Sequence, residues 1–78
     1  MTPYSKAQQA MAILKDAVHS YLETRGETGA TNAEIGRALG IYKGHVGHEG
    51  HISRTILAIM ESEEVVNQDP DSKAWSLR

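Results

Sequence analysis

The first third of the chain places its apolar residues at spacings of three and four. This spacing puts them on one face of a helix. Thr2-Pro3 or Ser5 supplies a start signal and Gly26 a stop signal, so the pattern predicts a helix over residues 5–25. The apolar face comprises Ala7, Ala10, Met11, Leu14, Ala17, Val18, Tyr21 and Leu22. A helix of this length exceeds what a small domain needs. We therefore expect part of it to cover a partner chain, as in a homodimer through this first helix.

A second, shorter helix is predicted over residues 32–39. Thr31 and Glu34 have the spacing of a capping box, in which each side chain bonds the backbone N–H of the other residue. Ile35, Ala38 and Leu39 form its apolar face. The residues just before it, 27–30, are expected to form a turn with room for a very short strand.

The helical period returns over residues 51–62 after an unusual segment. Residues 41–50 contain three consecutive Gly-His-x tripeptides, and glycines so closely spaced disfavour a helix, so we expect a loop. In the third helix, Ile52, Ile56, Ile59 and Met60 make the predicted inner face, with Leu57 at its flank. The positions predicted to lie outside that face are Ser53, Arg54, Thr55, Ala58 and Glu61.

The last segment, residues 64–78, alternates as a β-hairpin does. Two short β-prone runs flank Asp69-Pro70, which favours a turn with proline at its second position. Trp75 and Leu77 share one face by the period of two, and Trp75 is the expected anchor against the helices. The pattern therefore predicts a mainly α fold with a small β-hairpin, in one domain over residues 1–78.

Composition narrows the function classes. The chain has 78 residues and no cysteine, so disulfides, thiolate nucleophiles and cysteine metal sites are excluded. No apolar run is long enough to span a membrane, and the start does not resemble a signal peptide, so a cytoplasmic location is expected. No nucleophile–base set or phosphate-binding loop appears, so we expect neither enzymatic activity nor a cofactor.

Net charge is −2, yet the positive charge is concentrated in the middle of the chain. Residues 35–58 carry Arg37, Lys43 and Arg54 against the single carboxylate of Glu49, together with three of the four histidines. A local basic patch of this kind is an electrostatic feature of nucleic-acid binding.

Two stretches resemble the winged helix-turn-helix family of DNA-binding domains. Thr31-Asn32-Ala33-Glu34-Ile35-Gly36-Arg37-Ala38-Leu39-Gly40-Ile41 is similar to the family's second helix, and Ile52-Ser53-Arg54-Thr55-Ile56-Leu57-Ala58-Ile59 is similar to its recognition helix. Val65-Val66 and Trp75-Ser76-Leu77 match the strands of the wing. The resemblance covers about residues 5–78. Two departures stand out: the turn between the second and third helices is about six residues longer, and Glu63 or Glu64 replaces a glycine before the wing.

The resemblance implies three helices plus a two- or three-stranded wing, with the third helix reading the major groove of double-stranded DNA. It implies a role as a transcriptional regulator or as the DNA-targeting domain of a larger DNA-processing protein. On this interpretation Arg54 bonds a guanine edge, and Ser53 or Thr55 bonds phosphate or a base edge. The full set of predicted DNA-contacting residues is Arg37, Lys43, His45, His48, His51, Ser53, Arg54, Thr55 and Lys73, with Arg78 as a further candidate for phosphate.

Other interpretations of the same residues stay open. The acidic hairpin and the broad apolar stripe that Ile13 widens are also typical of a winged helix that binds another protein. His45, His48 and His51, with Glu49 as a fourth ligand, could hold a metal ion, but the glycines between them make ordering costly, and we predict no metal site. A surface loop without a specific role is a further alternative.

Overall fold

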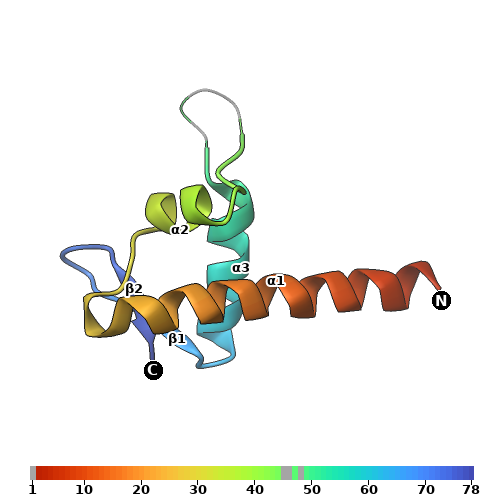
Figure 1. Ribbon diagram of the computed structural model, residues 1–78, viewed down its shortest axis with the longest axis horizontal. Helices are drawn as coiled ribbons and strands as arrows, with labels where there is room; N and C mark the ends of the chain where they lie inside the picture. The colour runs from red at the N-terminus through yellow and green to blue at the C-terminus, as the bar shows by residue number, and fades with distance from the viewer. Residues whose placement is uncertain (1, 45–46, 48) are drawn as a thin grey trace.

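The computed structural model describes residues 2–44, 47 and 49–78. Within these residues the prediction of a mainly helical chain with a small antiparallel hairpin is confirmed. The elements in chain order are α1 (Pro3–Arg25), the short 3-10 helix η1 (Gly26–Thr28), α2 (Asn32–Ala38), α3 (His51–Ser62), β1 (Val66–Gln68) and β2 (Trp75–Leu77). Figure 1 shows α3 crossing α1 steeply, with both strands near the C-terminal end of α1.

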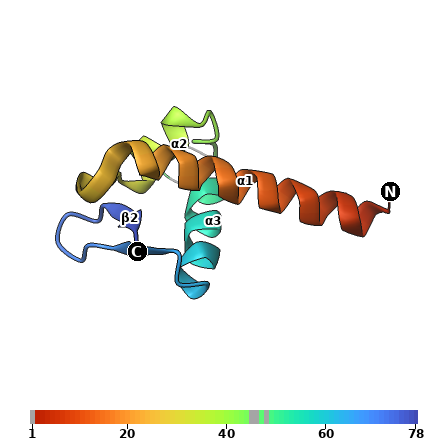
Figure 2. The same ribbon diagram turned by 60° about the horizontal axis from the view of Figure 1, so that its bottom comes forward.

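Helix α1 begins two residues earlier than predicted. The Thr2 hydroxyl accepts a hydrogen bond from the Ser5 N–H at 3.1 Å, and Pro3 occupies the first turn, where no N–H donor is needed. Only Val18 and Leu22 of this helix are buried, and both lie in its C-terminal half. The two views in Figures 1 and 2 agree that the N-terminal half extends beyond all other elements.

Helix α2 starts with the capping box that its sequence indicates. The Thr31 hydroxyl accepts from the Glu34 N–H at 3.2 Å, and the Glu34 carboxylate accepts from the Thr31 N–H at 2.9 Å. The bond from the Thr31 backbone lowers the pKa of the Glu34 carboxyl below its ordinary value, and the nearby Arg25 guanidinium adds to the effect. Helix α2 ends at Ala38, one residue before the predicted end, and Leu39 caps it.

A backbone hydrogen bond joins two residues on either side of the segment between α2 and α3. The Gly50 N–H donates to the Lys43 carbonyl at 2.8 Å, so residues 44–49 are inserted between two paired positions. The segment between these two positions has six residues, the same number by which the turn was expected to be longer. Among its members, His45, Val46 and His48 lie outside the described residues.

The hairpin is shorter than the predicted 64–78 segment. Val66 pairs with Leu77 and Gln68 with Trp75, and the Asp69 carboxylate accepts from the Ser72 N–H at 2.7 Å in the turn. That hydrogen bond lowers the pKa of the Asp69 carboxyl. Ala30 adds a single bridge to the outer side of β2, with bonds of 2.9 and 2.7 Å to Trp75.

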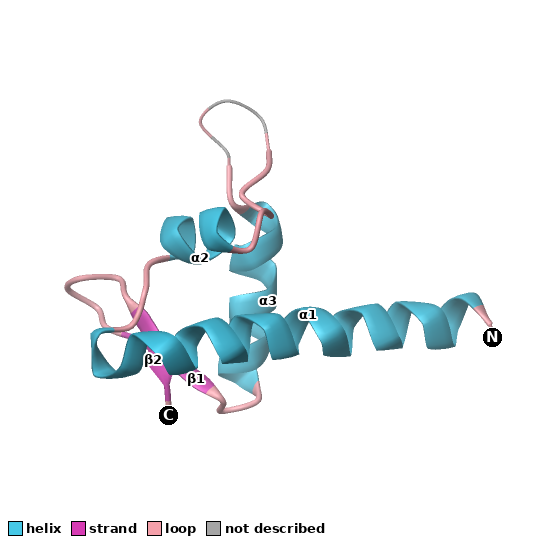
Figure 3. Ribbon diagram, viewed as in Figure 1, coloured by secondary structure: helices cyan, strands magenta, loops and turns pink. Residues whose placement is uncertain are grey.

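One buried cluster joins every element except η1. Figure 3 shows that both strands lie by the C-terminal half of α1, with none beside its N-terminal half. The core therefore sits where α1, α3 and the hairpin meet, and α2 covers it through Ile35. Its buried hydrophobic members are Val18, Leu22, Ala30, Ile35, Ile56, Leu57, Met60, Val66 and Trp75.

Candidate nucleic-acid interface

The start of α3 is fixed by the carbonyl oxygen of Gly50. This oxygen accepts from the Arg54 N–H at 3.0 Å, the Asn32 side-chain amide at 3.2 Å and the Ser53 hydroxyl at 3.3 Å. Gly50 adopts a φ of 85°, in the left-handed region that favours glycine, and a Cβ here would lie 2.6 Å from the Asn32 amide nitrogen. The first turn of α3 is therefore anchored to the first turn of α2.

The predicted inner face of α3 is wrong at its N-terminal end. Ser53, predicted to face DNA, is completely buried, whereas Ile52, predicted to face the core, is 41% exposed. The cause is the close packing of α2 and α3: a Cβ on Gly36 would lie 3.1 Å from the Ser53 hydroxyl oxygen. Only a small side chain fits between the two helices there, and its hydroxyl is satisfied by Gly50. Ser53 is thus a packing residue and is unavailable to DNA.

The remaining polar positions of the first two turns face outward. His51, Arg54 and Thr55 are exposed, and Ala58 continues the same exposed side. The Arg54 guanidinium lies 3.4 Å from the Glu49 backbone carbonyl, and within residues 2–44, 47 and 49–78 no carboxylate forms an ion pair with it. Among the described residues, no close carboxylate balances its charge, and its other N–H donors belong to an exposed side chain.

A second basic group lies at the end of α2. The Arg37 guanidinium stacks on the Tyr42 ring at 4.7 Å from its centroid, and Lys43 is exposed next to it. These side chains, with Gly36 and Gly40, line a shallow hollow of about 240 Å³. Stacking on an aromatic ring restricts the arginine and leaves its edge N–H groups able to bond an anion.

Tyr42 was missed by sequence reasoning. Its position near Arg37 depends on how the chain turns after α2, and an aromatic residue five positions after an arginine is a weak signal by itself. The tertiary arrangement also makes the tyrosine a neighbour of Gly36 and Gly50, where a Cβ atom at either glycine would lie 2.9 Å from a carbon of its ring. Tyr42 therefore connects the Arg37 group to the start of α3.

The two hairpin residues predicted to contact phosphate, Lys73 and Arg78, lie near acidic residues. Lys73 is exposed in the turn, at a φ of 66°, but Asp69 and Asp71 are exposed in the same turn. Arg78 lies 4.0 Å from the Glu64 carboxylate, so part of its charge is balanced within the chain. The hairpin consequently presents more negative than positive charge, which weakens any contact between it and phosphate.

The structure describes one of the three histidines that were predicted to contact DNA. His51 is exposed at the first position of α3, while His45 and His48 lie outside the described residues. Within residues 2–44, 47 and 49–78, no group of three or more His, Asp or Glu side chains is placed to hold a metal ion.

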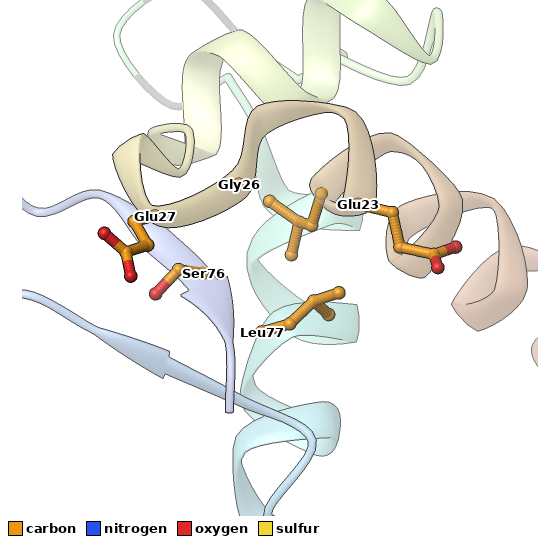
Figure 4. Close-up of a pocket in the computed structure, with 6 residues that line it drawn as sticks. Glu23, Gly26, Glu27, Ser76 and Leu77 are labelled. Atoms are coloured by element: carbon orange, nitrogen blue, oxygen red, sulfur yellow. The ribbon is translucent and has the colours of Figure 1, made fainter.

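Another hollow lies between the end of α1 and β2. It has a volume of about 410 Å³ and none of the predicted DNA-contacting residues lines it. Figure 4 shows the Glu23 and Glu27 carboxylates at its two sides, both pointing away from Leu77. Its rim is therefore acidic, and it offers no basic group to a nucleic acid.

No helix in the described part of the chain is both long and apolar enough to cross a membrane.

Comparison with known protein families, with curated proteins and with solved structures found no match to this chain.

Proposed function

We propose that this chain is a winged-helix module that binds double-stranded DNA and reads the major groove with the N-terminal half of α3. The order of three helices followed by a hairpin supports the winged-helix assignment, as does the Ala30 bridge to β2, which extends the hairpin by one paired residue. The insertion of residues 44–49 between the paired Lys43 and Gly50 leaves the packing of α2 on α3 intact.

The proposal rests on the exposure of Arg54 and on its lack of a carboxylate partner among the described residues. It lies on the outward side of a helix whose other side is locked into the core by Ile56, Leu57 and Met60. An exposed arginine on a rigid helix that fits the major groove is the arrangement with which proteins bond the O6 and N7 atoms of guanine.

The residues around Arg54 are expected to make two kinds of contact with DNA. Thr55 and Ala58 lie on the exposed side of α3, where a hydroxyl can bond a base edge or phosphate and a small side chain permits close approach. Arg37, in the last turn of α2, and Lys43, five residues after its end, bond the phosphate backbone, which fixes position and carries no sequence information. With a net charge of −2, we expect weak non-specific binding and a shallow dependence of affinity on salt.

The experiment begins with selection of a preferred duplex from a random pool. Arg54→Ala should then weaken binding to that duplex by about 1–3 kcal/mol and relax selectivity at one base pair. Arg54→Lys keeps the charge but loses the two-pronged geometry, so it should retain most non-specific affinity and still lose selectivity.

Lys6→Ala is the matched control, because it removes one exposed positive charge from the N-terminal half of α1. It should leave selectivity unchanged. Equal affinity of wild type and Arg54→Ala for the selected duplex would refute groove reading by α3.

One observation favours a second function, binding of a protein. Ile52 is 41% exposed on α3 and lines an apolar groove against α1. Exposed apolar surface of this kind is typical of protein interaction sites. The electrostatic arrangement of Arg37, Lys43 and Arg54 nevertheless favours DNA as the ligand of the polar side of α3.

A further inference from the structure

The apolar stripe of α1 continues toward the N-terminus, past the part of the helix that is buried in the core. Tyr4, Ala7, Met11 and Leu14 follow the same spacing as the buried Val18 and Leu22, so all six share one face. The burial changes along this face from complete at Val18 to 74% exposure at Tyr4. Figure 2 shows no other element beside the N-terminal turns, which we call the overhang, residues 3–10.

A groove of about 340 Å³ lies directly beside the overhang, and its wall is almost entirely apolar. Helix α1 contributes one side and the first turns of α3 the other. Ile52, whose exposure contradicts its predicted burial, belongs to this groove. The residues that line it are Met11, Leu14, His51, Ile52, Thr55 and Ile56.

Charge does not oppose contact here. Lys6 is the only charged residue in positions 3–14, and its place in the helical repeat is off the stripe of Tyr4 and Ala7. Covering this face therefore removes apolar surface from water without burying an ion, which makes association favourable.

We propose that the occupant of this groove is the overhang of a second copy of the chain, in a two-fold symmetric dimer. Each copy carries both halves of the contact, an overhang and a groove, and they adjoin on one helix. In an antiparallel pairing of two α1 helices that sets Ala7 opposite Met11, Tyr4 of each copy lies beside Leu14 of the other. The small side chains of Ala7 and Ala10 let the helices approach closely.

A second copy fits better than an unrelated helix because it forms two identical contacts at once. An unrelated helix would fill one groove and leave the overhang uncovered. Two overhangs of about 12 Å each, with their grooves, give an interface at the small end of the known range, below about 1,200 Å² in total. The dimer should therefore be in concentration-dependent exchange with the monomer.

The test compares two α1 side chains with nearly equal exposure. Tyr4 is 74% exposed on the stripe. Ile13, predicted at the edge of the stripe, is 70% exposed and lies roughly 180° around the helix from Tyr4. Sedimentation velocity over a concentration series, without DNA, should show a monomer–dimer equilibrium for the wild type. Tyr4→Ser should weaken association by about tenfold or more, because a buried aromatic anchor is lost twice per dimer. Ile13→Ser should leave association unchanged.

A charge pair then identifies the occupant. Tyr4→Lys and Ile52→Asp should each be monomeric alone, since each would place a charge in an apolar contact twice. An equimolar mixture should dimerise, because one contact pairs the two new charges and the other is wild type. Both side chains are exposed, so circular dichroism should show unchanged folding. A wild type that stays monomeric at every concentration, an equal loss in Ile13→Ser, or a mixture that fails to assemble overturns the proposal.

The groove includes His51 and Thr55, which the proposed DNA interface also uses. If that proposed function holds, dimerisation covers part of the DNA-reading end of α3, and DNA should shift the equilibrium toward monomer. This consequence depends on DNA binding, whereas the sedimentation experiments do not, so the two proposals fail separately.

Discussion

The two ends of α3 differ in how their charges are used. At the C-terminal end, Glu63 forms an ion pair with Lys15 of α1 at 2.9 Å, and Glu64 lies near Arg78. At the N-terminal end, Arg54 has no such carboxylate partner among the described residues, and the Arg37 guanidinium rests on an aromatic ring instead.

This difference separates charges that are paired within the chain from charges that have no carboxylate partner among the described residues. The carboxylates after α3 hold α1 and the end of the chain, although exposed pairs of this kind add little stability. Arg37, Lys43 and Arg54 form no ion pair among the described residues, and Arg37 stacks on the Tyr42 ring instead. A net charge of −2 conceals this separation, because it averages the two ends.

The largest expected effect tests whether both ends rest on one core. Leu57 is completely buried between them, and Leu57→Ala should lower the free energy of unfolding by about 2–5 kcal/mol through lost contacts and a cavity. Urea unfolding should be followed by circular dichroism, which reports on the helices, and by fluorescence of Trp75, the single tryptophan, which reports on the hairpin.

The two signals should change together in the wild type and in Leu57→Ala. Separate transitions would show that the hairpin end folds independently of the helices, and the comparison of two ends of one structural unit would no longer hold.

Acid should weaken the cap of α2 and the turn of the hairpin, through one carboxyl group each. The hydrogen bonds at Thr31 and Ser72 lower the pKa values of Glu34 and Asp69 in the folded chain. A group whose pKa is lowered on folding stabilises the fold above its unfolded value, and that contribution disappears as pH falls through the folded value. Unfolding free energy should therefore begin to drop near pH 4 (roughly, from ordinary carboxyl values) and continue to drop below it.

Glu34→Gln and Asp69→Asn separate the two contributions. Each amide can still accept the backbone hydrogen bond but cannot titrate, so each variant should lose part of the acid dependence measured by urea unfolding between pH 7 and pH 3. An unchanged pH profile in both variants would show that these two caps do not contribute to acid sensitivity.

The smallest expected effect concerns the hairpin as a wing. Asp71 is exposed in its turn, and Asp71→Asn should raise affinity for the selected duplex by roughly 0.5 kcal/mol at low salt, an effect that salt reduces. Asp16→Asn, on exposed α1, makes the same change in net charge and should have a smaller effect. Equal effects of the two variants on duplex affinity would place the hairpin no closer to DNA than α1.

Local patterns predicted the parts of the fold that depend on neighbouring residues. The spacing of Thr31 and Glu34 indicated the capping box, because both partners belong to the same helical turn. The alternation around Trp75 indicated the hairpin, because its two paired strands are also close together in the sequence. The exposure of Arg54 also agreed with periodicity, since Ile56 and Met60 lie roughly 120–160° around the helix from it.

Ser53 and Ile52 could not be placed in this way. Hydrophobicity predicts that isoleucine is buried and serine exposed, but the space beside α2 accepts only a small side chain, because Gly36 allows the two helices to approach closely. The stacking of Arg37 on Tyr42 depends likewise on the path of the chain after α2. Neither fact is encoded in the spacing of residues along one helix.

By itself, the sequence determined the helical segments, the caps, the hairpin and the concentration of positive charge in residues 35–58, since each arises from residues close together in the chain. Only the tertiary structure decided which side of α3 meets α2, which cations remain without a carboxylate partner among the described residues, and that the apolar stripe of α1 runs past its core. These properties depend on distances between segments far apart in sequence, and such distances are fixed only when the elements pack.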